Sequence, residues 1–273
     1  MRPRHYGSAA LIFALSSWAA PGETAAPAPR IHGKVAPKPA GRPTTLPPLP
    51  AATTGGDAWI DTPPDAVQTP AVKYAALDAA ACVTELARRQ IGFTKVADAR
   101  GVLAPVRLDG GLHGVSYHSA ISVSQRATSP YEIFDCRLVL ALDDFATLLA
   151  KHDIVEVIHM SVYRPPSQRG WTTGRIGQRH DGALAIDAGR FIKRDGTVLD
   201  VEKDFHGRIG SKTCGSDTGP NPATPAAVEL RQIVCESTDA HLFNVALTPD
   251  YNWQHRNHFH LEVTARVTWF LVH

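Results

Sequence analysis

Apolar and polar side chains alternate near the C-terminus, in the sequence NWQHRNHFHLEV of residues 252–263. Because successive side chains of a β-strand point to opposite faces, this alternation predicts a strand with one apolar and one polar face. The apolar face consists of Phe259, Leu261 and Val263, and the polar face consists of His258, His260 and Glu262. We expect the apolar face to fix the strand against the core and the polar face to carry chemistry.

Similar patterns predict the elements that precede this strand. Helices are predicted where apolar residues recur at helical intervals, in residues 74–90, 143–151 and 225–236. Residues 93–141 read as short strands and loops, and longer strands are predicted for residues 154–163, 183–192 and 242–247. Asp195 and Gly196 predict a hairpin turn. These elements predict an α+β domain with a central antiparallel sheet flanked by helices.

The N-terminus has the pattern of a secretory signal peptide. Arg2 and Arg4 precede an apolar run from Ser8 to Ala20, and small residues follow it. A run of about thirteen residues is too short to span a bilayer as a mature anchor. We therefore expect residues 1–20 to be removed as a signal peptide and the mature protein to have no integral membrane span.

Proline dominates the next segment. Residues 21–70 contain twelve of the 21 prolines and few aromatic or branched apolar residues, so they cannot bury enough apolar surface to offset the entropy of ordering. This composition predicts a disordered linker. The folded domain is expected in residues 71–273.

The charge balance excludes nucleic acid as a partner. The formal net charge is +2, and it falls to about zero once Arg2 and Arg4 leave with the signal peptide. Such a chain has no basic surface of the kind that binds phosphate backbones.

Four cysteines in an exported chain predict two disulfides. They are Cys82, Cys136, Cys214 and Cys235, and their spacing includes no C-x-x-C pair, which argues against a zinc ribbon or a thioredoxin-like site. Of the three possible pairings we favour Cys82 with Cys136 and Cys214 with Cys235, because each bridge then closes a loop within one half of the domain. Export and disulfides together predict a periplasmic or secreted protein.

A second cluster of candidate metal ligands lies in the sequence HDGALAID. It begins with His180 and ends with Asp187, which shares its predicted strand face with Ala185 and Gly189. These small neighbours leave open volume above the carboxylate. His180 and Asp187 form with His260 a set of two imidazoles and one carboxylate, which is the zinc arrangement that keeps a fourth position for catalysis.

These motifs resemble those of known families. Arg164, His180-x6-Asp187 and the C-terminal H-x-x-H-x-H are similar to the metallopeptidase superfamily of D-Ala-D-Ala carboxypeptidases, penicillin-insensitive murein endopeptidases and hedgehog. More closely, SVYRPP, QRHDGALAIDAGRFIKRDG and HRNHFHLEV resemble the bacterial extensin-like C-terminal domain over roughly residues 78–267. The resemblance implies a fold like that of hedgehog and the D,D-peptidases, with zinc held by His180, Asp187 and His260.

The resemblance also implies roles for three further residues. His258 and His255 would serve as general base and acid, and Arg164 would stabilise an oxyanion. The carboxypeptidases typically have a glutamate three residues before the last ligand, where this chain has Asn257. The endopeptidases use histidine in this neighbourhood, which fits His255 and His258 better.

The expected function is that of an exported zinc peptidase that hydrolyses amide bonds of peptidoglycan peptides. The main alternative is a non-catalytic module that binds the cell wall and retains the metal site. A third reading is a structural wall protein whose active part is the proline-rich segment.

Overall fold

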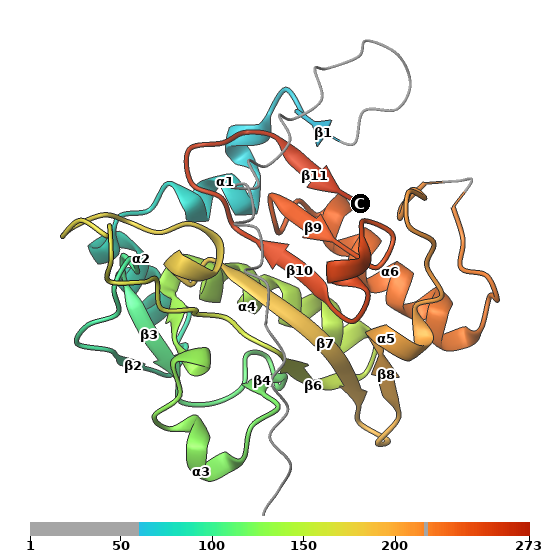
Figure 1. Cartoon of the computed structure of the whole chain (residues 1–273), viewed down its shortest axis with the longest axis horizontal. Coiled ribbons are helices and arrows are strands. Elements are labelled where there is room, and N and C mark those ends of the chain that lie inside the picture. Colours follow the sequence, from blue (N-terminus) through green and yellow to red (C-terminus); the bar gives the residue numbers. More distant parts are fainter. Residues whose placement is uncertain (1–59, 216–217) are drawn as a thin grey trace, which may run out of the picture. The chain divides into compact units, whose positions relative to one another are not determined.

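Helices and short strands alternate in residues 60–215 and 218–273, the part of the chain that the computed structural model describes (Figure 1). The α-helices are α1 Pro70–Ala75, α2 Ala79–Arg88, α3 Val123–Arg126, α4 Cys136–Lys151, α5 Val201–Asp204 and α6 Pro225–Asp239. The strands are β1 Ile60–Asp61, β2 Phe93–Lys95, β3 Pro105–Leu108, β4 Ser116–Ser119, β5 Phe134–Asp135, β6 Ile154–His159, β7 Ala185–Lys193, β8 Val198–Asp200, β9 Val245–Leu247, β10 Phe259–Glu262 and β11 Phe270–Val272. Short 3₁₀ helices are η1 Ala66–Gln68, η2 Pro130–Glu132, η3 Arg179–Gly182 and η4 Trp253–His255.

The large sheet has eight strands and is mixed. Its order is β1-β11-β9-β10-β7-β6-β4, with β8 paired to β7, while β2, β3 and β5 form a second, smaller sheet. The α+β class is therefore confirmed, but the expectation of a wholly antiparallel sheet was wrong, because β4 pairs with β6 and β11 with β9 in parallel. The connection from β4 to β6 includes α4, and a crossover of this kind allows neighbouring strands to run in the same direction.

Helix α4 is the centre of the core. Twelve of its residues are buried, and its Phe145 meets Phe191 of β7 edge-on at a centroid distance of 6.5 Å. Phe191 in turn packs on Phe259 of β10 at 5.7 Å. These contacts confirm that Phe259 belongs to the apolar face of the C-terminal strand.

Two helix boundaries differ from those that the sequence predicted. Helix α4 begins at Cys136 rather than Asp143, because its first two turns, residues 136–142, are buried on every side and show no amphipathic period. The helix expected over residues 74–90 is two helices, since the side chain of Asp78 accepts a hydrogen bond from Ala81 N and starts α2 as a new helix.

Part of the expected linker is ordered. Ile60 and Asp61 pair with Leu271 and Phe270, and η1 and the first residue of α1 also lie before residue 71. The expected signal peptide, residues 1–20, and residues 21–59 of the expected linker lie outside the described residues.

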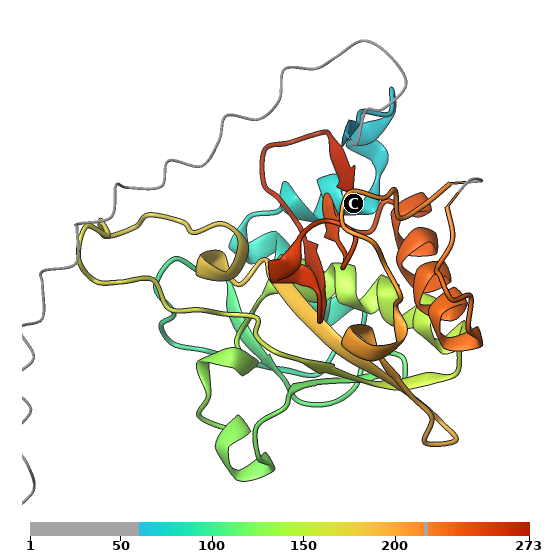
Figure 2. The same ribbon diagram turned by 45° about the vertical axis from the view of Figure 1, so that its right-hand side comes forward.

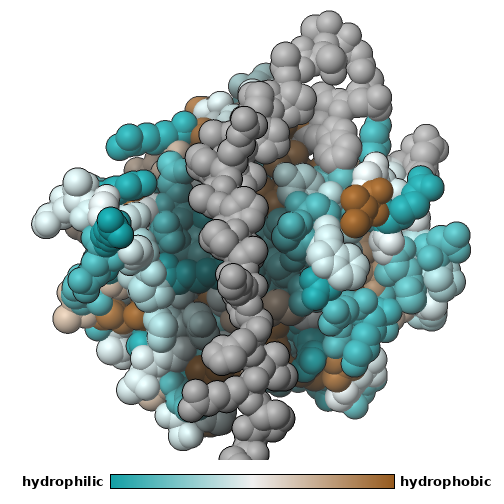
Figure 3. All heavy atoms as spheres, viewed as in Figure 1, coloured by the Kyte–Doolittle hydropathy of each residue, from teal (hydrophilic) through white to brown (hydrophobic). Residues whose placement is uncertain are grey.

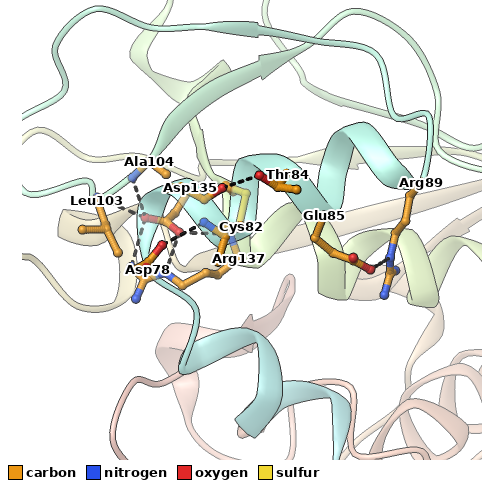
Figure 4. The surroundings of a disulfide bond; sticks show 12 residues. Asp78, Cys82, Thr84, Glu85, Arg89, Leu103, Ala104, Asp135 and Arg137 are labelled. Atoms are coloured by element: carbon orange, nitrogen blue, oxygen red, sulfur yellow. Dashed lines mark hydrogen bonds and ion pairs between the residues drawn. A yellow bond between two sulfur atoms is a disulfide. The ribbon is translucent and has the colours of Figure 1, made fainter.

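Both favoured disulfides are present. Cys82 and Cys136 join α2 to the start of α4, and Cys214 and Cys235 join a loop to α6. Beside the first bridge, the buried carboxylate of Asp135 accepts hydrogen bonds from Leu103 N at 3.1 Å and Arg137 Nε at 2.7 Å (Figure 4). Two disulfides indicate that the protein folds in an oxidising compartment.

Removal of the first disulfide is expected to destabilise the fold most. The bridge Cys82–Cys136 spans 54 residues and the bridge Cys214–Cys235 spans 21. Replacing both cysteines of either bridge by serine should lower the free energy of unfolding by about 2–5 kcal/mol. The loss should be about 1 kcal/mol larger for Cys82–Cys136 than for Cys214–Cys235. Urea denaturation of the two double variants measures this difference, and the reverse order would contradict it.

The visible surface has a mostly polar character. On the face shown in Figure 3, hydrophobic residues form small separate patches among hydrophilic ones. None of the helices in residues 60–215 and 218–273 combines the length and the apolar composition needed to cross a bilayer.

Candidate metal centre

The register between β7 and β10 creates the centre. The two strands are antiparallel neighbours, and His260 lies directly opposite Asp187. Directly opposed residues share one face of a sheet, so the imidazole and the carboxylate meet across the strands. The register between β6 and β7 shifts at Gly189, where two residues of β7 oppose one of β6. This bulge returns Phe191 to the core face, so that the same strand carries Asp187 on one side and core residues on the other.

His180 reaches the centre from the 3₁₀ helix η3, which precedes β7. The residues Arg179 and Ala183 that flank it in this turn have φ values of 48° and 53°, in the left-handed region that non-glycine residues seldom adopt. Arg164 N donates to the carbonyl oxygen of His180 at 3.0 Å, which ties the turn to the segment that follows β6. Backbone strain of this kind is characteristic of positions whose side chains must point in one direction.

Hydrogen bonds orient both imidazoles toward Asp187. His180 Nδ1 donates to the carbonyl oxygen of Val162 at 2.7 Å, and its Nε2 lies 3.1 Å from Asp187 Oδ1. His260 Nε2 donates to Glu262 Oε2 at 3.2 Å, and its Nδ1 lies 3.0 Å from the same Oδ1. With the other nitrogen of each ring held in this way, His180 Nε2 and His260 Nδ1 are the nitrogens available to a metal. Partners of this type orient metal-binding histidines in proteins.

This donor set fits a divalent metal. One ligand atom from each of His180, Asp187 and His260 lies within 4.8 Å of the other two, and all three residues are buried. Two lone pairs and a carboxylate oxygen that converge repel one another unless a proton or a cation lies between them. Two imidazoles and one carboxylate are a common zinc ligand set. The structure thus brings together the three residues that were predicted as ligands.

Hydrogen-bond donors and a cation surround Asp187. Its Oδ2 accepts hydrogen bonds from Ser161 Oγ at 2.9 Å and from Arg164 Nη2. Burial alone would raise the pKa of Asp187, but the hydrogen bonds with His180 and His260 outweigh it and hold the pKa far below the usual range of a carboxyl group. The carboxylate is therefore ionised and ready to bind a cation.

His258 lies beside the three candidate ligands, and His255 lies farther away. His258 Nε2 is 3.3 Å from Asp187 Oδ1, and its Nδ1 bonds Asn257 Oδ1 at 2.9 Å. His255 Nδ1 bonds Asn252 Oδ1 at 2.8 Å, and its ring lies 5.2 Å from that of His258. Burial lowers the pKa of His258 and lowers that of His255 to about 4, so both rings are neutral near pH 7.

Arg164 has both an ion-pair partner and access to solvent. Its Nε donates to Ser161 Oγ at 2.9 Å, its Nη2 pairs with Asp187, and its side chain is 54% exposed. Arg164 also lines a cavity of about 740 Å³ together with His180, His255, His258 and other residues. A cavity of this size accommodates a small ligand or a segment of peptide.

Three residues at the centre were not assigned a role from the sequence. Glu262 orients His260, Ser161 links Arg164 to Asp187, and Asn257 contacts His258. Glu262 was expected on the same strand face as His260, and its position two residues away could have identified it as the partner of that imidazole. Nothing in the local sequence indicates the role of Ser161, because its partner is 26 residues away.

Replacing Glu262 by glutamine should weaken metal binding without removing a ligand. The variant loses the charge that holds His260, and loss of such a partner typically costs 10- to 100-fold in metal affinity. Competition between the protein and a chromophoric chelator for zinc measures the change. Glu236→Gln, on the exposed end of α6, is the matched control, and an equal loss in both variants would contradict the role assigned to Glu262.

One protein family matches this chain over most of its length. The model of the family described as extensin-like protein C-terminus matches residues 80–272, which include all the candidate site residues and all four cysteines. No curated protein and no solved structure matches the chain.

Proposed function

We propose that this chain, which belongs to the extensin-like protein C-terminus family, is an exported zinc peptidase that hydrolyses amide bonds in peptidoglycan peptides. The observation that carries the proposal is the convergence of His180, Asp187 and His260 at a cavity that His258 and Arg164 also line. Two groups that can assist amide hydrolysis, the neutral imidazole of His258 and the guanidinium of Arg164, lie beside this donor set.

His180 Nε2, Asp187 and His260 Nδ1 would hold the metal. Zinc, when bound, supplies a Lewis acid that lowers the pKa of water toward about 7 and polarises carbonyl groups. The chain contributes the orientation of the ligands through Val162 and Glu262. Burial of the three ligands strengthens their electrostatic interaction with a cation.

His258 is the residue best placed to move a proton. Its ring is neutral near pH 7, and Nε2 points to the same carboxylate oxygen as the candidate ligands. An imidazole in this position accepts a proton from the attacking water and later donates it to the leaving amine. The ring of His255 packs against those of His258 and His260, but its Nδ1 bonds Asn252 Oδ1 rather than Asp187.

Arg164 would stabilise negative charge on the substrate carbonyl. Its guanidinium is partly exposed to the cavity and is held by Ser161 and Asp187. A fixed donor near a developing oxyanion typically accelerates acyl transfer by about 10²–10³-fold.

The order of the motifs supports the further proposal that the domain is related to the D-Ala-D-Ala carboxypeptidases, the murein endopeptidases and hedgehog. This relationship is the reason for choosing peptidoglycan peptides as substrates. The expected signal peptide and the two disulfides support a location in the periplasm or outside the cell.

Digestion of purified peptidoglycan tests the proposal. The zinc-loaded full chain is expected to release soluble peptides, whose masses identify the bond that is cut. His180→Ala and chelator-treated protein serve as controls, and neither should release peptides. Stoichiometric zinc binding together with intact peptidoglycan would overturn the proposal and favour a non-catalytic module that binds the wall.

A further inference from the structure

The loop between β6 and β7 forms a basic part of the cavity wall. The cavity is lined by three arginines, Arg164, Arg175 and Arg179, but by only two acidic residues, Asp181 and Asp187. Asp187 is buried and its carboxylate is already surrounded by Arg164 and imidazoles, so it does not neutralise the rest of the wall. An excess of guanidinium groups in a concave site raises the local concentration of anions.

Close backbone contacts at Gly101 and Gly177 fix the position of the loop that carries these arginines. The loop extends beyond the end of β6 before it returns to β7 (yellow in Figure 2). Gly177 N donates to the carbonyl oxygen of Gly101 at 2.7 Å. A Cβ atom on Gly177 would lie 2.5 Å from the backbone of Asp181, and one on Gly101 would lie 2.8 Å from the ring of Trp171. No larger residue fits at these contacts, which keep the loop against the domain.

Arg175 is oriented but not paired with a carboxylate. Its guanidinium lies 4.4 Å from the centroid of the Trp171 ring, a stacking distance that restricts its rotation. In the described part of the chain Arg175 has no acidic partner. Trp171 also lines the cavity, so the stacked pair faces the space in which a substrate would lie.

Arg179 is only partly engaged. Its Nε lies 3.4 Å from Glu262 Oε2, yet its side chain is 67% exposed. Arg179 directly precedes His180, so its guanidinium and the candidate metal centre border the same cavity. Two guanidinium groups on one wall provide several donors for a single anionic group.

We propose that Arg175 and Arg179 form a subsite that binds a carboxylate of the substrate while the scissile amide lies at the metal centre. The inference rests on the proposed peptidase function, because that function defines the substrate as a peptide. Planar guanidinium groups bind carboxylates through paired hydrogen bonds, which a neutral amide cannot replace. The substrate class is therefore an acidic peptide with a free carboxylate near the bond that is cut.

Calorimetry with the full chain tests the subsite without relying on turnover. The probes are a short acidic peptide with free carboxylates and the same peptide with its carboxylates amidated. Zinc-free protein should bind the acidic peptide about three- to tenfold more tightly than the amide, the range for a partly exposed charged contact. Arg175→Ala should remove most of this preference. Arg169→Ala is the matched control, because Arg169 belongs to the same exposed loop but does not line the cavity.

Kinetics separate the subsite from the peptidase function. If the zinc-loaded chain cleaves the acidic peptide, Arg175→Ala should raise KM three- to tenfold and leave kcat within about twofold, since the subsite binds ground state and transition state alike. Equal binding of both peptides, or an equal loss in Arg169→Ala, overturns the subsite even if both peptides are cleaved. Preferential binding of the acidic peptide without cleavage of either supports the subsite and contradicts the peptidase function.

Discussion

Replacing Asp187 by asparagine is expected to weaken zinc binding and slow hydrolysis together. Asp187 Oδ1 lies 3.0 to 3.3 Å from nitrogens of His180, His258 and His260 and is the point at which the centre converges. Removing a residue that only orients a metal ligand typically lowers metal affinity about 10- to 100-fold. Removing the ligand itself should therefore lower it at least about 100-fold. Without the metal the transition state loses several kcal/mol of stabilisation, which lowers the rate by at least about a thousandfold.

The fold should survive this change. Asparagine has nearly the size of aspartate, and the side chain of Arg164, which loses its partner, is 54% exposed and accessible to water. Zinc titration and peptide release from peptidoglycan measure the effect, and circular dichroism verifies the fold. Asp181→Asn is the control, because Asp181 lines the same cavity but is exposed. A folded Asp187→Asn variant that bound zinc as tightly as the original chain would exclude the proposed ligand set.

The second large effect is expected from His258→Ala. His258 contacts Asp187 directly, whereas His255 contacts Asn252 and lies beside His258. A general base of this kind contributes about 10²–10⁴-fold to the rate, so kcat should fall by that factor while zinc remains bound. His255→Ala should lower kcat by less than about tenfold, because its ring packs against His258 and His260 while its Nδ1 bonds Asn252 rather than Asp187.

Added imidazole distinguishes proton transfer from positioning. The cavity beside His258 has a volume of about 740 Å³, large enough for a free imidazole molecule in the space that the alanine variant leaves. Partial recovery of hydrolysis in His258→Ala with imidazole, but not in His255→Ala, would assign the proton transfer to His258. A larger loss of kcat in His255→Ala than in His258→Ala would reverse the assignment.

Local patterns predicted strands β6 to β10 and the longer helices α2, α4 and α6 in part or in full. The alternation around Phe259 predicted β10, and the turn at Asp195 and Gly196 predicted the hairpin between β7 and β8. The start of α4 was missed, because residues 136–142 are all buried and show no helical period. Neither the parallel pairs of the sheet nor the pairing of β1 with β11 could be predicted, since they depend on contacts between distant segments.

The residues of the candidate centre were predicted from residue types and spacing. His180, Asp187 and His260 stand out because of a glycine-rich turn, small neighbours and a strand with one polar face. The roles of Val162 and Ser161 were not predictable, because a backbone carbonyl and a hydroxyl carry no pattern until the fold places them.

The amino-acid sequence by itself determined the chemical groups available and the strand faces that carry them, because side-chain direction repeats locally along the backbone. The tertiary structure decided which of these groups meet. It set His260 opposite Asp187, gave each imidazole an acceptor for its second nitrogen and brought Arg175 to the cavity wall. Strand register and loop packing depend on pairings between residues far apart in the chain, and no local period specifies them.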